Sequence, residues 1–203
     1  MIKKILLICS IICAGTLMRA NDTKQEFERL LREKSVQIIS IKCDFKQIRT
    51  MAVFAEDDIK EGMFTYKRPG NILLHFEDGD YIKMTETDFS IRNVGVTTDV
   101  KVSANPMLKE LKRLLSACMT GDITAMSSGF NMGISENPDS YIVILTPIKG
   151  RGASRMKSVT MYFDKKDMSL SKLILEEPSG DSIGYEFWNK KFNIEVSEET
   201  FGK

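Results

Sequence analysis

The chain has 203 residues, with 29 basic and 28 acidic side chains and a net charge of +1. The first 20 residues hold Lys3, Lys4 and Arg19 and no acid, so removing them leaves 26 basic against 28 acidic residues, a net charge of −2. A near-neutral chain lacks the basic surface that phosphate backbones require, which argues against nucleic acid as a partner. The length suits a single domain with a sizeable core.

Residues 1–20 have the pattern of an export signal. Lys3 and Lys4 form a positive start, an apolar run follows over Ile5–Ala14, and Ala20 is a suitable cleavage residue. The run is shorter than the roughly 20 apolar residues that a membrane-spanning helix needs. An uncleaved amphipathic anchor is the alternative. We therefore predict cleavage near Ala20 and a mature domain over residues 21–203.

The next segment predicts one amphipathic helix followed by a strand. Asn21-Asp22-Thr23 can cap a helix, and apolar residues then recur at three- and four-residue spacing to about Ser35. The spacing then changes to two, which is typical of a half-buried strand. The alternating apolar residues of this strand are Ile39, Ile41, Cys43 and Phe45.

Short strand-like runs follow in quick succession, separated by good turn sequences such as Pro69-Gly70 and Asp78-Gly79-Asp80. Before the middle of the chain they cover Ile59–Lys67, Ile72–Phe76, Tyr81–Thr85, Phe89–Asn93 and Thr97–Val102. In the second half they cover Tyr141–Thr146, Ser158–Phe163, Ser169–Glu176 and Asp181–Trp188. Strands at this spacing with no helix between them predict an antiparallel meander.

A second helix interrupts the strands. Asn105 can cap it, Pro106 suits its first position and Gly121 can end it. Its apolar stripe consists of Met107, Leu108, Leu111, Leu114, Leu115, Cys118 and Met119. On the other, solvent-facing side of the predicted helix fall Lys109, Glu110, Lys112 and Arg113. Residues 120–140 are rich in Ser, Gly, Met and Asn, and we interpret them as a loop.

These elements predict an α+β fold with nine or ten strands and two or three helices. One face of an antiparallel sheet of this length must be covered by other elements, and two or three helices are few to cover it. Methionine is frequent on the strands and helices, and its flexible thioether suits a wall that repacks around ligands of varied shape. An ordinary core patched with methionine is the alternative.

The sequence offers little for catalysis. His75 is the only histidine and lies in a strand-like run beside Phe76, and the tetrahedral zinc ligand sets are absent. The sequence contains no nucleophile elbow, phosphate loop or dinucleotide fingerprint. Cys43 and Cys118 remain after export, either as buried apolar residues or as a disulfide. We therefore predict no enzyme activity, no cofactor and no metal.

Four motifs, in order, resemble the outer-membrane lipoprotein carrier family, LolA. The strand pair over 62–76, Gly-Met-Phe-Thr-Tyr-Lys-Arg-Pro-Gly-Asn-Ile-Leu-Leu-His-Phe, resembles the signature of that family. The segment Cys43-Asp44-Phe45-Lys46-Gln47 resembles its first strand, and Asn105-Pro106-Met107-Leu108 resembles its mid-chain helix entry. Residues 141–147, Tyr-Ile-Val-Ile-Leu-Thr-Pro, resemble a later strand. The order and spacing agree from about residue 23 to residue 201.

The resemblance implies an unclosed antiparallel β-barrel, a half-barrel, with a lid of two to three α-helices over a hydrophobic cavity. It also implies a monomeric periplasmic carrier that takes acylated lipoproteins from an inner-membrane lipoprotein-releasing transporter to an outer-membrane acceptor. The alternative is a lipid- or glycolipid-binding module, or an envelope sensor, on the same fold. We expect the cavity to be lined by Phe45, Phe64, Tyr66, Leu74 and Phe76, and the lid stripe to be Met107, Leu108, Leu111, Leu114 and Leu115.

Arg68 is the predicted lid latch. It stands at the end of a strand-like run beside Pro69-Gly70, and strand ends of an open barrel lie at the rim where a lid meets the wall. A guanidinium has five donors, and a helix C-terminus offers unpaired carbonyls and partial negative charge. In the family that the chain resembles, the arginine of the matching basic–proline motif holds the lid. The alternative is an exposed charge at a strand end.

Overall fold

The computed structural model describes residues 22–85, 89–99, 106–148 and 156–202. The predicted export signal, the helix cap at Asn105 and the end of the strand predicted over 97–102 lie outside these residues. Eleven strands form one sheet in the order β6-β5-β4-β3-β2-β1-β11-β10-β9-β8-β7. In chain order the strands are β1 (Ser40–Thr50), β2 (Asp58–Lys67), β3 (Asn71–Phe76), β4 (Tyr81–Met84), β5 (Phe89–Asn93), β6 (Val96–Asp99), β7 (Phe130–Glu136), β8 (Ser140–Pro147), β9 (Ser158–Asp164), β10 (Leu170–Glu176) and β11 (Ser182–Phe192).

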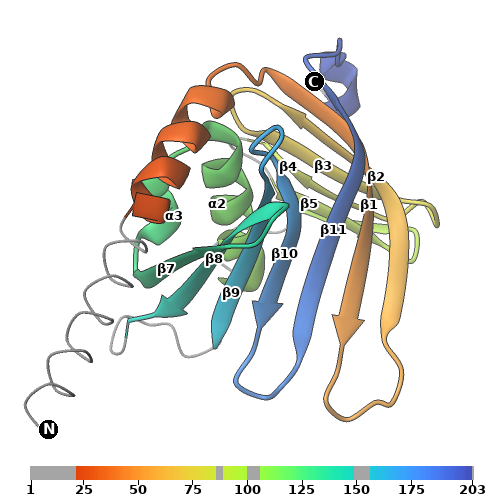
Figure 1. The fold of residues 1–203 in the computed structure, drawn as a ribbon. Coiled ribbons are helices and arrows are strands. Elements are labelled where there is room, and N and C mark those ends of the chain that lie inside the picture. Colours follow the sequence, from red (N-terminus) through yellow and green to blue (C-terminus); the bar gives the residue numbers. More distant parts are fainter. Residues whose placement is uncertain (1–21, 86–88, 100–105, 149–155, 203) are drawn as a thin grey trace, which may run out of the picture.

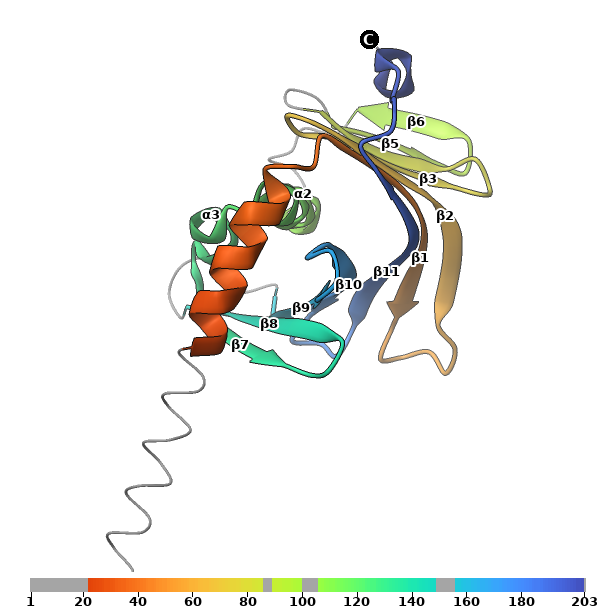
Figure 2. The ribbon, with the colours of Figure 1, turned by 45° about the horizontal axis from the view of Figure 1, so that its top comes forward.

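The sheet is antiparallel throughout and does not close. Each pair of neighbouring strands runs antiparallel, and β1 joins the two halves by pairing with β2 on one side and with β11 on the other. Within the described residues β6 and β7 are the two edges, and no ladder joins them. The sheet curves around three helices, which lie on its concave face (Figures 1 and 2). The prediction of a half-barrel with a helical lid is therefore confirmed.

The lid consists of a helix over residues 22–35, here called the N-terminal helix, together with α2 (Pro106–Thr120) and α3 (Ile123–Ser127). A short 3₁₀ helix, η2 (Glu198–Phe201), follows the last strand and lies apart from the lid (Figure 2). The bounds of the N-terminal helix and of α2 agree with the sequence prediction. Among the residues that the structure describes, no helix is both long and apolar enough to cross a bilayer.

The core lies between the helices and the concave face of the sheet. Strand β9 shows the alternation that builds it, because Val159, Met161 and Phe163 are fully buried and their neighbours are half-buried. The N-terminal helix packs on the same strands through Phe27, whose ring centroid lies 5.1 Å from that of Phe163 and 5.5 Å from that of Tyr141. Burying aromatic rings of this size contributes a large share of core stability.

The prediction of a loop over residues 120–140 is wrong. These residues contain α3, whose first turn is capped by the Asp122 side chain accepting from the Ala125 N–H, and strand β7. Strand β7 pairs with β8 from Phe130 opposite Pro147 to Glu136 opposite Tyr141. Its Ser, Asn and Gly residues alternate with apolar ones that pack on the core, so long-range pairing outweighs the low strand propensity of the segment. Sequence reasoning therefore missed strand β7.

Candidate lid and cavity

Arg68 holds the end of the N-terminal helix. It follows the last residue of β2, and its Nε donates to the Ile38 carbonyl at 2.6 Å while its Nη2 donates to the Ser35 carbonyl at 2.5 Å. Ser35 is the last helical residue. The backbone N–H of Arg68 also donates to the Ile39 carbonyl at 2.9 Å. The predicted latch residue therefore makes one hydrogen bond to the last residue of a lid helix and two to the segment that joins this helix to β1.

The chemistry of this contact follows from the helix end. The last carbonyls of a helix have no partner within the helix and carry partial negative charge, which a guanidinium satisfies well. Arg68 is half-buried, beside the buried Tyr66. Burial raises the pKa of Tyr66, and the positive charge of Arg68 opposes this. At the rim of the half-barrel, the guanidinium of Arg68 thus lies against the C-terminal end of the N-terminal helix.

The predicted lid stripe faces the core where its side chains are described. Leu111, Leu114 and Leu115 are buried against the concave face. The side chains of Met107 and Leu108 lie outside the described residues. From the polar side of the same helix, Lys112 Nζ donates to the Thr85 carbonyl at 2.5 Å, which ties α2 to the end of β4.

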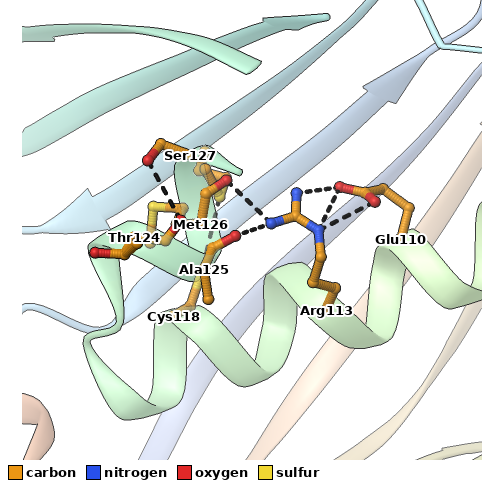
Figure 3. Close-up of polar contacts among 8 residues, drawn as sticks. Glu110, Arg113, Cys118, Thr124, Ala125, Met126 and Ser127 are labelled. Carbon is orange, nitrogen blue, oxygen red and sulfur yellow. Dashed lines mark hydrogen bonds and ion pairs between the residues drawn. The ribbon is translucent and has the colours of Figure 1, made fainter. Parts of the chain in front are cut away.

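Arg113 is a second arginine of the lid, which sequence reasoning placed on the solvent side of α2. It pairs with Glu110 on the same helix, and its Nη1 donates to the carbonyls of Ala125 and Met126 in α3 (Figure 3). Its guanidinium also lies 5.3 Å from the ring centroid of Phe130 at the start of β7. Arg113 therefore joins α2, α3 and β7 into one unit. The sequence carries no motif for this contact, because it depends on the unrecognised α3.

The two larger lid helices meet at their C-terminal ends. Gly121, which ends α2 with φ +68°, lies so close to the N-terminal helix that a Cβ there would stand 2.2 Å from Ser35 Oγ and 3.1 Å from the Leu31 carbonyl. Ser35 itself is buried. Ser35 thus contacts both the rim of the sheet and α2, since its carbonyl accepts from Arg68 and its side chain packs on Gly121.

The space between lid and sheet is nearly filled. A cavity of about 10 Å³ lies between α2 and strands of both halves of the sheet. Sites for small ligands are usually of several hundred Å³, so in this structure, here called the closed state, the cavity between α2 and the sheet is too small for such a ligand. The cavity is lined by Ile41, Cys43, Phe64, Leu115, Met119, Ser169, Leu170, Phe187 and Lys190.

The five residues predicted to line the cavity are all buried, but only Phe64 borders the space that remains. Phe45, Tyr66, Leu74 and Phe76 lie in the packed core around it. The rings of Phe45 and Phe76 meet edge to face at a centroid distance of 5.2 Å, as do those of Phe64 and Phe187. Sequence reasoning missed the polar members of the lining, Ser169 and Lys190.

Cys43 and Cys118 are free, buried thiols, so of the two alternatives left by the sequence the structure shows apolar burial. Burial raises the pKa of both thiols to about 12. Cys118 Sγ lies 3.6 Å from Met161 Sδ, which places it between α2 and β9. Cys43 lines the cavity from β1.

No group of His, Cys, Asp and Glu side chains suited to a metal ion occurs among the described residues. His75 is exposed on β3 and faces away from the core. The arrangement as a whole defines a class of protein: a half-barrel whose concave face is closed by helices that arginine side chains hold in place.

The model of the outer membrane lipoprotein carrier protein LolA matches residues 36–202, and the chain belongs to this family. No curated protein matches it by sequence. An uncharacterized conserved protein from Thermus thermophilus has a similar fold, with a TM-score of 0.51 and 9% identity over 89% of this chain and 93% of the other.

Two further solved structures resemble the chain more distantly. A LolA superfamily protein from Nitrosomonas europaea gives a TM-score of 0.43 at 14% identity, over 85% of this chain and 96% of the other. The Mycobacterium tuberculosis lipoprotein LppX gives 0.43 at 12% identity, over 84% and 96%.

Proposed function

We propose that this protein is a periplasmic carrier that binds the acyl chains of lipoproteins between its helical lid and the concave face of its sheet. In this proposal the chain is exported, is cleaved near Ala20 and acts as a monomer. It takes its cargo from an inner-membrane lipoprotein-releasing transporter and gives it to an outer-membrane acceptor. The observation that carries the proposal is the bonding of Arg68 to the end of the N-terminal helix above a nearly filled apolar space.

The energetics suit a lid that cargo can open. Burying a CH₂ group is worth about 0.8 kcal/mol, so exposing a chain of roughly 16 carbons to water costs on the order of 13 kcal/mol. A hydrogen bond to a charged group contributes about 1.5–3 kcal/mol. Two such side-chain bonds from Arg68 are weak beside the acyl chain, so cargo can displace the lid. Once the cargo has left, these bonds act together with the burial of Leu111, Leu114 and Leu115 to close the lid again.

The family to which the chain belongs supports this proposal, and so does the lining of the cavity. Seven of the nine lining residues are apolar or a buried thiol, and they include Leu115 and Met119 from the lid itself. The same surface of α2 therefore covers the sheet in the closed state and would contact an acyl chain in the open state. Cargo and lid compete for one surface, which allows both loading and release.

The experiment is transfer of labelled lipoprotein from the loaded carrier to acceptor membranes. Arg68→Leu weakens the closed state, so the variant should load cargo but release it more slowly than wild type. Arg49→Leu is the matched control, because Arg49 is an exposed arginine on β1 that lies away from the helix end. Transfer by Arg68→Leu at the wild-type rate would contradict the proposed role of this arginine.

The alternative, a lipid or glycolipid carrier or an envelope sensor on the same fold, is favoured by one observation: the presence of the polar pair Lys190 and Ser169 in the cavity. Mass spectrometry of material extracted from the purified protein distinguishes the two. A triacylated protein supports the lipoprotein carrier, and free phospholipid or glycolipid supports the alternative.

A further inference from the structure

Strand β11 contains an extra residue at the edge of the cavity. Lys42 of β1 pairs with Lys191, and Asp44 pairs with Trp188, so two residues of β11 stand opposite the single residue Cys43. The two residues are Asn189 and Lys190. Asn189 has φ +53°, and its Nδ2 donates to Asp44 Oδ2 at 2.7 Å. This is a β-bulge, a feature that re-aims a side chain.

The bulge turns a lysine toward the core. Tyr185 and Phe187 are buried on the concave face, and Trp188 is exposed on the other. In a regular strand Lys190 would share the face of Trp188, because side chains two residues apart point the same way. The extra residue reverses this, and Lys190 lines the cavity together with Phe64, Leu115 and Met119.

The ammonium group of Lys190 has donors to spare. Its Nζ donates to Ser169 Oγ at 2.7 Å, and Ser169 Oγ in turn donates to Asp167 Oδ1 at 2.5 Å. An ammonium has three N–H donors, and among the described residues only this one hydrogen bond from it is found. Burial lowers the pKa of Lys190, and Asp167, Asp164 and Cys43 oppose the lowering.

The nearby carboxylates are already engaged in the turn between β9 and β10. Asp167 Oδ1 accepts from the backbone N–H and the hydroxyl of Ser169, and Asp164 Oδ1 accepts from the Lys166 N–H at 2.8 Å. Neither of these contacts uses the ammonium directly. Lys190 is half-buried at the edge of an otherwise apolar cavity, and its hydrogen-bond partner there is a hydroxyl and not an anion.

We propose that the ammonium of Lys190, positioned by Ser169, forms a head-group site that binds the carboxylate or phosphate of an anionic acyl amphiphile, whose chain lies along Phe64, Leu115 and Met119. This inference rests on the proposed function in one respect, since the lid must open to acyl chains. The inference goes beyond the proposed function by naming the chemistry of the ligand head group. A charge-assisted bond to a carboxylate or phosphate oxygen is stronger than one to a hydroxyl.

The test is displacement of a bound apolar fluorescent dye by ligands with one palmitoyl chain. The ligands are palmitate, 1-palmitoyl-glycerol 3-phosphate, and two neutral controls, methyl palmitate and 1-palmitoyl-glycerol. Wild type should bind at least one anionic ligand about tenfold or more tightly than its neutral counterpart. Preference for palmitate identifies a carboxylate head, and preference for the glycerol phosphate identifies a phosphate head.

Lys190→Met should abolish this preference, measured within the variant as the ratio of its affinities for each anionic ligand and its neutral counterpart. Lys191→Met is the matched control, because Lys191 is the next residue and is exposed, and it should keep the preference. Lys190→Gln serves the same purpose if the methionine variant does not fold. Equal binding of anionic and neutral ligands by wild type, or a preference that survives in Lys190→Met or Lys190→Gln, would overturn the inference. Failure of wild type to bind any of the four ligands would also overturn the inference, whereas the proposed function is tested separately by lipoprotein transfer.

Discussion

Lys67 and Arg68 are adjacent in sequence and bind two different segments of the chain. Arg68 donates to the Ser35 and Ile38 carbonyls at the end of the N-terminal helix. Lys67 Nζ donates to the Val196 carbonyl at 2.7 Å and pairs with Glu198 at 2.5 Å, in the segment that follows the last strand. Two consecutive residues at the rim therefore contact the end of the lid helix and the C-terminal segment.

This difference predicts distinct effects for two leucine variants. Arg68→Leu removes the charged donors from the end of the N-terminal helix, so local opening of residues 22–35 should become easier by roughly 1.5–3 kcal/mol. The measurement is native-state hydrogen exchange, where the amides of the last helical turns should exchange about tenfold to a hundredfold faster.

Lys67→Leu should accelerate exchange in residues 196–202 and leave the N-terminal helix unchanged, because Lys67 contacts Val196 and Glu198. Equal acceleration of the helix in both variants would show that Arg68 has no specific hold on the lid.

Arg113→Leu should weaken the contact between α2 and α3 in the lid. The substitution leaves the carbonyls of Ala125 and Met126 without their charged donor and removes the partner of Glu110. We expect a loss of roughly 1–3 kcal/mol in the free energy of unfolding, measured by urea denaturation. Lys109→Leu is the control on the same helix, since Lys109 is exposed. A stability of Arg113→Leu equal to that of the control would mean that α3 is held by apolar packing alone.

Gly121→Ala should destabilise the lid more than Gly129→Ala. Both glycines have positive φ, +68° and +83°, so both variants carry backbone strain of order 1–3 kcal/mol. Only at position 121 would the added Cβ also meet Ser35, since a Cβ at position 129 lies in open space. We expect the loss of unfolding free energy to exceed that of Gly129→Ala by at least about 1 kcal/mol in urea denaturation. Equal losses of unfolding free energy in the two variants would show that the contact between Gly121 and Ser35 can open at no cost in free energy.

The two thiols report on lid opening. The thiolate is the reactive form, and burial raises the pKa of Cys43 and Cys118 to about 12. At pH 8 alkylation of the folded protein should therefore be slower than that of the urea-unfolded protein by on the order of a thousandfold. Arg68→Leu should speed alkylation at Cys43, which lines the cavity, and peptide mass spectrometry assigns the site. Rapid alkylation of folded wild type would contradict the closed state.

Much of the fold could be predicted because it depends on local patterns. The alternation in β1 and β9 and the apolar stripe of α2 each determine which face of an element is buried, and the strand bounds agree with the structure to within a few residues. Strand β7 was missed because Asn131, Gly133 and Ser135 lower its strand propensity, although Phe130, Met132 and Ile134 alternate with them, and its pairing with β8 outweighs this.

The site was predictable only in part. Arg68 stands beside a turn within a recognisable motif, so its contact with a helix end could be anticipated. Lys190 could not, because strict alternation assigns it to the outer face and only the bulge at Asn189 reverses this. Arg113 was placed on the solvent side for a similar reason: its partners Ala125 and Met126 belong to a helix of five residues. Irregular features decide these positions, and they leave no periodic signal in the sequence.

The most direct test of the account is hydrogen exchange of the mature protein with and without a synthetic triacylated lipopeptide. The control ligand is the same peptide without acyl chains. The account predicts that the acylated ligand speeds exchange at the end of the N-terminal helix, where Arg68 binds, and slows it in strands β1, β2 and β11, which line the cavity. The control peptide should change neither. Unchanged exchange in the N-terminal helix at saturating acylated ligand would contradict the account, because it would show that cargo binds without opening the lid.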